Sequence, residues 1–251
     1  MTTSKMTEQQ FYSTLKERFL QIVREHGLSA SRINIKSKSL SAEEAIGITS
    51  RKDFPIITGK EIMLQADYMG AIGQAFTDSP AVFSGTLEDI FLLDITNDLH
   101  ALGLFIASLN AVMRYLALAE GTIHCKNEEP EICAEKYVQY IKETYGNPKI
   151  ALVGFQPALI ENISKEFDLR VLDLNPENIG KIKYNTLIEN GIDDYEDVIN
   201  WADIVLCTGS TLCNGSIVNF INIGKEVVFF GTTLAGAAEI MGLKRVCFCG
   251  V

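Results

Sequence analysis

The sequence predicts an α/β protein with two parts, an α+β domain over residues 1–125 and a parallel-sheet domain over residues 126–251. In the second part, short and nearly continuous apolar runs alternate with helical stretches, which indicates a parallel sheet covered on both faces. In the first part, strands precede helices, the order of an α+β unit. The segment GTIHCKNEEPE at 121–131 is charged and rich in turn residues, so it is typical of a connector between domains.

The composition is that of a globular protein, with 47% hydrophobic and 22% charged residues among 251. The net charge of −10 argues against nucleic acid and anionic membranes as partners. The first residues, MTTSKMTEQQ, lack the basic and then apolar pattern of a signal peptide, so we expect a cytoplasmic protein. The apolar stretch 101–119 is interrupted by Ser108, Asn110 and Arg114, which favours a buried core helix over a membrane span.

The first part contains helices and strands with clear local patterns. Apolar residues at helical spacing predict a helix over 8–26, which Gly27 ends as a C-cap glycine would. We further expect strands over 31–40, 61–69 and 71–77, a short helix after Thr86, and longer helices over 97–119 and 132–145.

The second part contains five apolar runs that predict strands, at 149–155, 169–174, 203–207, 226–230 and 245–249. Helices are expected from Pro157, after Ser216 as an N-cap, and over 235–241. Parallel strands place their carboxyl ends at one edge of the sheet, where such folds bind ligands. The polar loops that follow the first four strands are therefore expected to meet at that edge.

The central feature is WADIVLCTGSTLCNGSIVNF at 201–220, which predicts a buried strand, a polar loop with glycines and a helix. The loop hydroxyls, the Asn214 carboxamide and several backbone N–H groups suit an anionic or hydrogen-bonding ligand. The alternative is a turn in which Thr and Ser side chains only satisfy the local backbone. The convergence of four polar loops on one edge favours the ligand site.

We predict one ligand site at this edge, with Asn214 as its central contact because a carboxamide both donates and accepts hydrogen bonds. Asn110 lies within the apolar helix and must find partners, either in a packing hydrogen bond between helices or in the ligand. The N-terminal domain is expected to close over the site. The predicted ligand-binding residues are Gly154, Asp173, Asn175, Pro176, Thr208, Gly209, Ser210, Thr211, Asn214, Gly215, Gly231, Thr232, Thr233 and Asn110.

Several common motifs are missing from the sequence. The loop GFQPAL after the first strand lacks the glycines of GxGxxG, so we expect no tight binding of NAD, although Asp173 lies about twenty residues further on. There is no Walker loop and no HExxH. His26 and His124 are expected at the surface and His100 in the core.

The cysteines show no CxxC pair, and Cys247 and Cys249 are expected to be packing residues. No metal site is predicted. No pairing of a nucleophile with a base is visible, so the catalytic residues stay unassigned.

The motif WADIVLCTGSTLCNGS, preceded by VLDLNP and followed by VVFFGTT, resembles the heavy-metal chelation family, whose function is unknown. The segments GAIGQAFTD and Leu109-Asn110-Ala111 are similar to its companion N-terminal domain. The resemblance is strongest over residues 149–251. It implies an enolase N-terminal-like domain followed by a Rossmann-like domain that resembles methyltransferases, both lining one cleft. Carried over, the motif falls on Thr208, Gly209, Asn214 and Gly215, with Asn175 and Pro176, while Ser216 stands where the family more often has Thr.

The functional expectation is an enzyme that condenses or hydrolyses a pterin-, flavin- or siderophore-like compound linked to heavy-metal chelation, in a cleft between the domains. One alternative is a non-catalytic module that binds a nucleotide-like ligand or a metal–chelate complex. Another is a methyltransferase that uses S-adenosylmethionine, which the fold and Asp173 suggest. The expected partner is a small-molecule ligand, without nucleic acid or membrane. The cofactor, the substrate and the formation of a homo-oligomer are left open.

Overall fold

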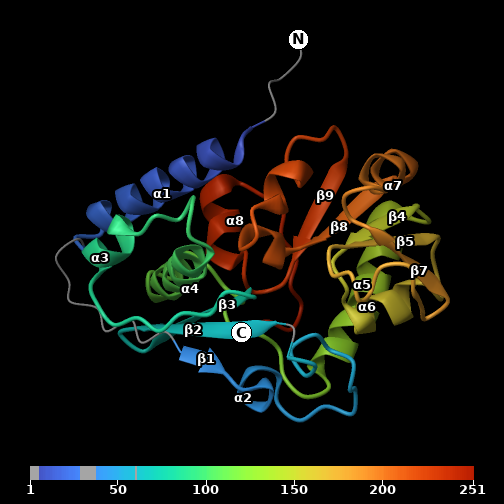
Figure 1. The fold of residues 1–251 in the computed structure, drawn as a ribbon, viewed down its shortest axis with the longest axis horizontal. Helices are drawn as coiled ribbons and strands as arrows, with labels where there is room; N and C mark the ends of the chain where they lie inside the picture. Colours follow the sequence, from blue (N-terminus) through green and yellow to red (C-terminus); the bar gives the residue numbers. More distant parts are fainter. Residues whose placement is uncertain (1–5, 29–37, 60) are drawn as a thin grey trace.

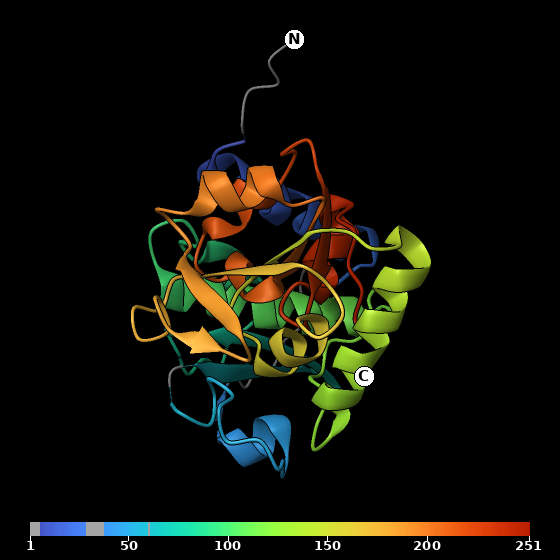
Figure 2. The same ribbon diagram turned by 90° about the vertical axis from the view of Figure 1, so that its right-hand side faces the viewer.

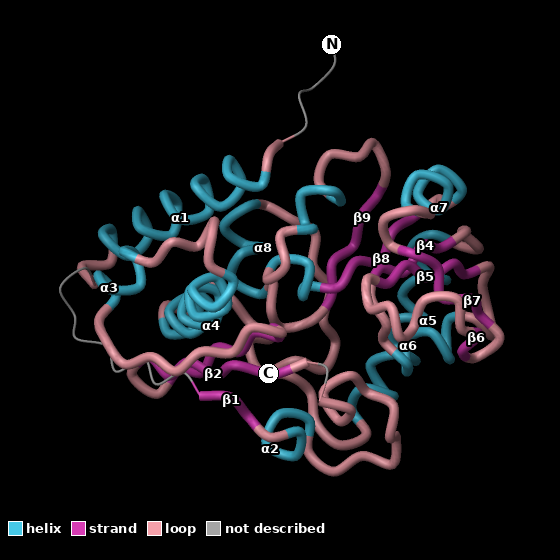
Figure 3. Tube along the Cα trace, in the orientation of Figure 1, coloured by secondary structure: helices cyan, strands magenta, loops and turns pink. Residues whose placement is uncertain are grey.

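The computed structural model describes residues 6–28, 38–59 and 61–251, which form an α/β fold with two sheets (Figures 1 and 3). The smaller sheet is antiparallel and has the order β1-β2-β3. The larger sheet has the order β6-β7-β5-β4-β8-β9. All its strands except β6 run parallel to one another. Among the residues described, no helix combines the length and hydrophobicity needed to cross a bilayer.

The smaller sheet is a hairpin with one short added strand, and it supports the central helix. Its strands are β1 (Lys38–Leu40), β2 (Ile62–Tyr68) and β3 (Ala71–Thr77). Helix α4 (Leu99–Tyr115) packs against β2 and β3 (Figure 1). A Cβ atom at Gly73 would lie 2.1 Å from the backbone nitrogen of Ala111, so only glycine lets α4 approach β3 this closely.

The helices of the first part begin at side-chain caps, of which only the start after Thr86 was predicted from the sequence. Thr7 and Gln10 form a capping box at α1 (Glu8–Glu25), and Thr86 with Asp89 does the same at α3 (Leu87–Leu92). A short helix that we did not predict, α2 (Ala42–Ile46), follows β1. Of the predicted strand over 31–40, residues 31–37 lie outside the described residues.

The larger sheet is covered on both faces, which confirms the prediction made from its apolar strands. Along β4, Ala151 and Val153 join a core that also contains buried residues of α1, α4 and α8, whereas Ile150 and Leu152 join a core with α5 and α6. Figure 2 shows α5 along one flank of the molecule. The strands are β4 (Ile150–Val153), β5 (Leu169–Asp173), β6 (Ile182–Lys183), β7 (Thr186–Asn190), β8 (Ile204–Thr208) and β9 (Glu226–Phe230), and the helices are α5 (Glu129–Tyr145), α6 (Pro157–Ile163), α7 (Tyr195–Trp201) and α8 (Ala235–Met241).

The predicted strand over 245–249 is wrong. Only Arg245 pairs with the sheet, in one bridge to Phe229. Beyond it the chain packs on α5, where the Tyr137 hydroxyl donates to the Val246 carbonyl and its ring meets that of Phe248 at 5.0 Å between centroids. The fifth parallel strand is instead β7, which pairs with β5.

The α-helix predicted after Ser216, at the end of the 201–220 stretch, is also wrong in type. The loop forms two short 3-10 turns, η1 (Gly209–Leu212) and η2 (Ser216–Phe220). Ser216 is not an N-cap, because Gly215 takes that position in a left-handed conformation with φ of 79°. A glycine adopts this conformation without strain, so the chain turns sharply there.

Candidate functional site

A cavity of about 790 Å³ lies at the carboxyl edge of the larger sheet. The loops after β4, β5, β8 and β9 form one side of it. The other side comes from the segment before β2, with Phe54 and Glu61, and from the end of β3, with Phe76 and Asp78. The cavity therefore lies between the two sheets, at the edge where parallel sheets bind ligands.

Twelve of the fourteen residues predicted from the sequence line this cavity. They are Gly154, Asp173, Asn175, Pro176, Thr208, Gly209, Ser210, Thr211, Asn214, Gly231, Thr232 and Thr233. The other two, Asn110 and Gly215, do not line it. A Cβ atom at Gly215 would instead lie 2.6 Å from the carboxylate of Glu8, away from the cavity wall.

Of the two roles that the sequence left open for Asn110, packing hydrogen bonds or contact with a ligand, the structure shows packing hydrogen bonds. It is fully buried in α4. Its Nδ2 donates to the carbonyls of Gln74, Thr232 and Thr233 at 2.9, 3.2 and 3.0 Å, and its Oδ1 accepts the Gly236 N–H at 2.8 Å. Both Nδ2 hydrogens and one acceptor site of Oδ1 thus fix the loop after β9 to α4 and β3.

Glycine lets the loops after β4 and β8 meet. Gly154 has φ of 96°, and a Cβ atom there would lie 2.7 Å from Cγ2 of Thr208. Around Thr208 the hydroxyls bond locally, because Thr211 Oγ1 donates to the Thr208 carbonyl at 2.7 Å. The loop is therefore a rigid wall whose hydroxyls are in part already used.

Asn214 lies at the exposed part of the cavity wall. Its Oδ1 accepts hydrogen bonds from the backbone N–H and the hydroxyl of Ser216, at 3.1 and 2.6 Å. Such a side-chain turn fixes the carboxamide. The Nδ2 group can then donate to a ligand.

Replacing Asn214 by alanine should weaken ligand binding several-fold, because one hydrogen bond contributes about 0.5–1.5 kcal/mol. The ligand-bound fraction of freshly purified protein can be measured by native mass spectrometry. Asn200→Ala, at an exposed position on α7, is the matched control and should keep full occupancy. Equal occupancy in the two variants would show that Asn214 is no ligand contact.

Asp173 ties two of the cavity loops together. Its Oδ2 accepts the Phe155 N–H at 2.8 Å, and its Oδ1 accepts the Asn175 N–H at 2.7 Å. The carboxylate at the end of β5 thus holds the backbone that follows β4. Its first role is to shape the cavity.

Glu61 is the main residue that sequence analysis missed. It is partly buried at the cavity wall. Burial raises its pKa from 4.5 to about 7, and the negative charges of Asp173 and Asp78 add to the shift. A carboxyl group with a pKa near neutrality in a cavity is a candidate acid–base catalyst.

His124 also lines the cavity, although the sequence placed it at the surface of a connector. Its Nδ1 lies 2.6 Å from the Cys125 carbonyl, and its ring stands edge-on to Phe76 at 5.2 Å between centroids. Burial lowers the pKa of His124, so the imidazole is neutral at pH 7. A neutral imidazole can accept a proton.

A second cavity of about 40 Å³ is lined by His124, Cys125, Cys133 and Cys247. Burial raises the pKa of Cys133 to about 12 and that of Cys125 above its ordinary value, so both remain thiols at neutral pH. Within the described parts of the chain, no three or more His, Cys, Asp or Glu residues are arranged to hold a metal ion.

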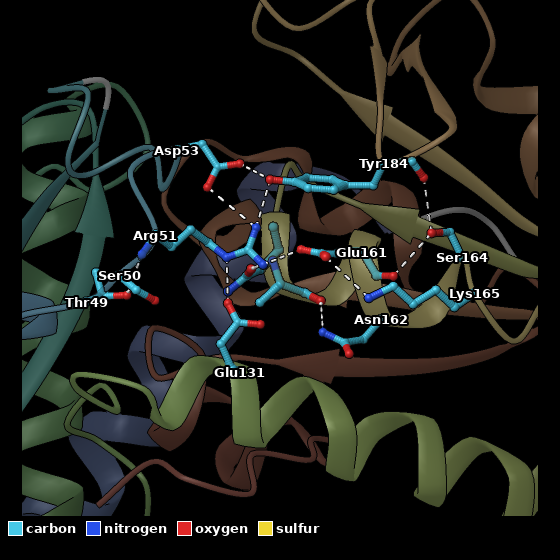
Figure 4. Close-up of polar contacts among 12 residues, drawn as sticks. Thr49, Ser50, Arg51, Asp53, Glu131, Glu161, Asn162, Ser164, Lys165 and Tyr184 are labelled. Atoms are coloured by element: carbon cyan, nitrogen blue, oxygen red, sulfur yellow. Dashed lines mark hydrogen bonds and ion pairs between the residues drawn. The ribbon is translucent and has the colours of Figure 1, made fainter.

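Arg51 binds side chains of α5 and α6 (Figure 4), and it lies three residues before Phe54, which lines the cavity. Its guanidinium donates to Glu131 of α5 and Glu161 of α6, each at 2.5 Å, and to the Tyr184 hydroxyl at 2.8 Å. The three nitrogens of this one planar guanidinium thus connect the first part of the chain to the larger sheet and its helices.

Replacing Arg51 by alanine should destabilise the protein by about 2–3 kcal/mol, because two part-buried carboxylates lose their partner. Hydrogen exchange should also speed up over residues 48–59. Lys165→Ala is the control, since the Lys165 side chain is 59% exposed and pairs with the same Glu161 at 3.3 Å. It should cost at most about 0.5 kcal/mol. Equal losses in urea denaturation would contradict a special role for Arg51.

No Lys or Arg lines the main cavity within residues 6–28, 38–59 and 61–251. A pyrophosphate would find no cationic side chain there, and the loop after β4 has a single glycine, Gly154. Calorimetry should therefore detect no micromolar affinity for NAD. A micromolar Kd would contradict the assignment of these loops.

One family model matches the part of the chain that contains the larger sheet. Residues 138–246 match DUF364, described as "Putative heavy-metal chelation". This match confirms the resemblance drawn from the motifs in 149–251. The matched segment covers β4 to β9 and all four cavity loops. The likeness of residues 1–125 to an enolase N-terminal domain stays a prediction.

Two crystal structures of DUF364 proteins of unknown function share the fold. One, from Pyrococcus horikoshii, is 16% identical with a TM-score of 0.52, and the match covers 89% of this chain and 79% of that one. The other, from Desulfitobacterium hafniense DCB-2, is 10% identical with a TM-score of 0.52, over 92% and 84% of the two chains. No curated protein matches the chain.

Proposed function

We propose that this protein is an enzyme that binds a small polar molecule between its two sheets and condenses or hydrolyses it, with Glu61 as the acid–base catalyst. The observation that carries the proposal is the position of Glu61, whose pKa of about 7 lies in the range where a carboxyl group both gives and takes protons at neutral pH. This carboxyl lines the same cavity as the four loops of the larger sheet.

The cavity supports a ligand of the pterin, flavin or siderophore kind. Its volume of about 790 Å³ is in the usual range for small-molecule sites. Rings of Phe76, Phe155 and Tyr195 line it and suit a flat, heteroaromatic body. In this proposal the chelation named in the family description belongs to the small molecule.

The catalytic role of Glu61 follows from its two protonation states. In hydrolysis, the ionised carboxylate takes a proton from water as the water attacks. The protonated carboxyl then gives that proton to the leaving group. In condensation the same two steps run in the opposite direction. The neutral imidazole of His124 can accept the other proton of the attacking water.

The proposal can be tested by incubating purified protein with a cell metabolite extract and following each compound by mass spectrometry. We expect at least one compound to be consumed by the wild type and by Glu17→Gln, an exposed position on α1. Glu61→Gln should consume it about 10²–10⁴-fold more slowly. Equal rates in both variants, or no consumption by the wild type, would refute the proposed function.

A further inference from the structure

We infer that the ligand of the main cavity presents a positively charged, flat nitrogen group, such as an amidine, a guanidine or a protonated amino-heterocycle. This inference rests on the proposed function and specifies its substrate class. It excludes phosphate esters and other anions as the group bound at Glu61.

The first argument is the charge of the cavity. Among the described residues, its lining contains three carboxylates, Glu61, Asp78 and Asp173, and no Lys or Arg. Two arginines that contact segments around the cavity are engaged with other partners. Arg51 is bound to Glu131 and Glu161, and Arg245 donates its Nε hydrogen to the Gly231 carbonyl at 2.8 Å. An anionic ligand would therefore be repelled, whereas a cation would relieve the repulsion among the carboxylates.

The second argument concerns which of the cavity carboxylates already accept hydrogen bonds. Asp173 already accepts two backbone N–H groups. Within the part of the chain that the structure describes, Glu61 has no hydrogen bond or ion pair. One of its carboxylate oxygens can thus accept an N–H group of an amidine or a guanidine, while the other oxygen stays available for the proton that Glu61 transfers.

The third argument is independent of the carboxylates and concerns Thr232. This residue is 1% exposed and belongs to the cavity wall. Its Oγ1 has no hydrogen-bond partner among the described residues. A buried hydroxyl without a partner costs free energy, and a polar ligand group that reaches it, as donor or as acceptor, would satisfy it.

The fourth argument concerns the apolar part of the lining. The aromatic residues are Phe54, Phe76, Phe155, Tyr195, Phe220 and Phe230. The faces of such rings carry partial negative charge and attract cations. A flat cation is therefore complementary in charge to both the rings and the carboxylates, whereas a flat anion matches the rings in shape only.

The test uses three probes of the same shape that differ in charge: benzamidine, benzamide and benzoate. Each is titrated at pH 8 into the wild type, Glu61→Gln and Glu17→Gln, while the backbone amide signals of residues 208–211 and 231–233 are followed by NMR. We expect benzamidine to bind about tenfold more tightly than benzamide, since charge-assisted hydrogen bonds are the stronger ones, and benzoate to bind most weakly. Glu61→Gln should lower only the benzamidine affinity, about tenfold, and Glu17→Gln should change none.

Two results would overturn the inference. Benzoate binding at the cavity as tightly as benzamidine would refute the cation, although the cavity would remain a ligand site as the proposed function requires. An unchanged benzamidine affinity in Glu61→Gln would refute the pairing with this carboxylate. If none of the three probes shifts the cavity signals, both the inference and the proposed ligand site fail.

Discussion

Replacing Asn110 by alanine should destabilise the protein by about 3–5 kcal/mol, because it leaves several buried polar groups without a partner and opens a small cavity. The groups that lose their partner are the carbonyls of Gln74, Thr232 and Thr233 and the N–H of Gly236. No other side chain in α4 connects the helix to β3, to the loop after β9 and to α8 in this way within the described residues.

Urea denaturation gives the free energy of unfolding that checks this expectation. Ser108→Ala is the matched control, because Ser108 is fully buried on the same helix but donates only to the Leu104 carbonyl, at 2.6 Å. That hydroxyl bonds within its own helix, so its loss should cost about 1 kcal/mol or less. A cost for Asn110→Ala no larger than that of the control would mean that the loop after β9 does not depend on Asn110.

The loop after β9 also shows why stability and site geometry are connected here. Asn110 holds the carbonyls of Thr232 and Thr233, while Thr233 Oγ1 accepts the Phe76 N–H at 2.9 Å. These bonds join the two sides of the cavity. A residue that touches no ligand can therefore set the shape of the site.

Much of the larger sheet could be predicted from the sequence because its signals are local. The run Ile150-Ala151-Leu152-Val153 is apolar at every position of β4, as a strand covered on both faces must be. The loops of the site follow from the same reasoning, since parallel strands bring their carboxyl ends together. That is why most of the predicted residues line the cavity.

The residues that sequence analysis missed depend on contacts that no local pattern encodes. Glu61 precedes β2, far from Asp173 in the sequence, and only the packing of the two sheets brings their charges together. Strand β7 was missed because its pattern, TLIEN, is mostly polar, and it lies beside the edge strand β6. The run at 245–249 is apolar enough for a strand, yet the contacts of Phe248 with α5 direct it away from the sheet.

Glu61→Gln should make the protein more stable at pH 8 by about 2–3 kcal/mol and leave its stability at pH 4.5 or below nearly unchanged. The pKa of Glu61 is raised from 4.5 to about 7 in the folded protein. Between these values the folded state binds more protons than the unfolded state, so the free energy of unfolding falls as the pH rises. The loss is complete above pH 7, where folding carries the cost of an ionised, partly buried carboxylate. Glutamine has nearly the same shape and no charge, so it avoids this cost.

The measurement is urea denaturation of the wild type, Glu61→Gln and Glu17→Gln at pH 4.5 and pH 8. The difference between wild type and Glu61→Gln should grow with pH, whereas Glu17, exposed on α1, should give a pH-independent difference near zero. A pH-independent difference for Glu61→Gln would show that the carboxyl is not perturbed. We expect Glu61→Gln to be more stable than the wild type and also to lose turnover. The two results together would identify Glu61 as a residue that serves the reaction and lowers the stability of the fold. Replacing a residue used only for packing would not raise stability and abolish turnover at once.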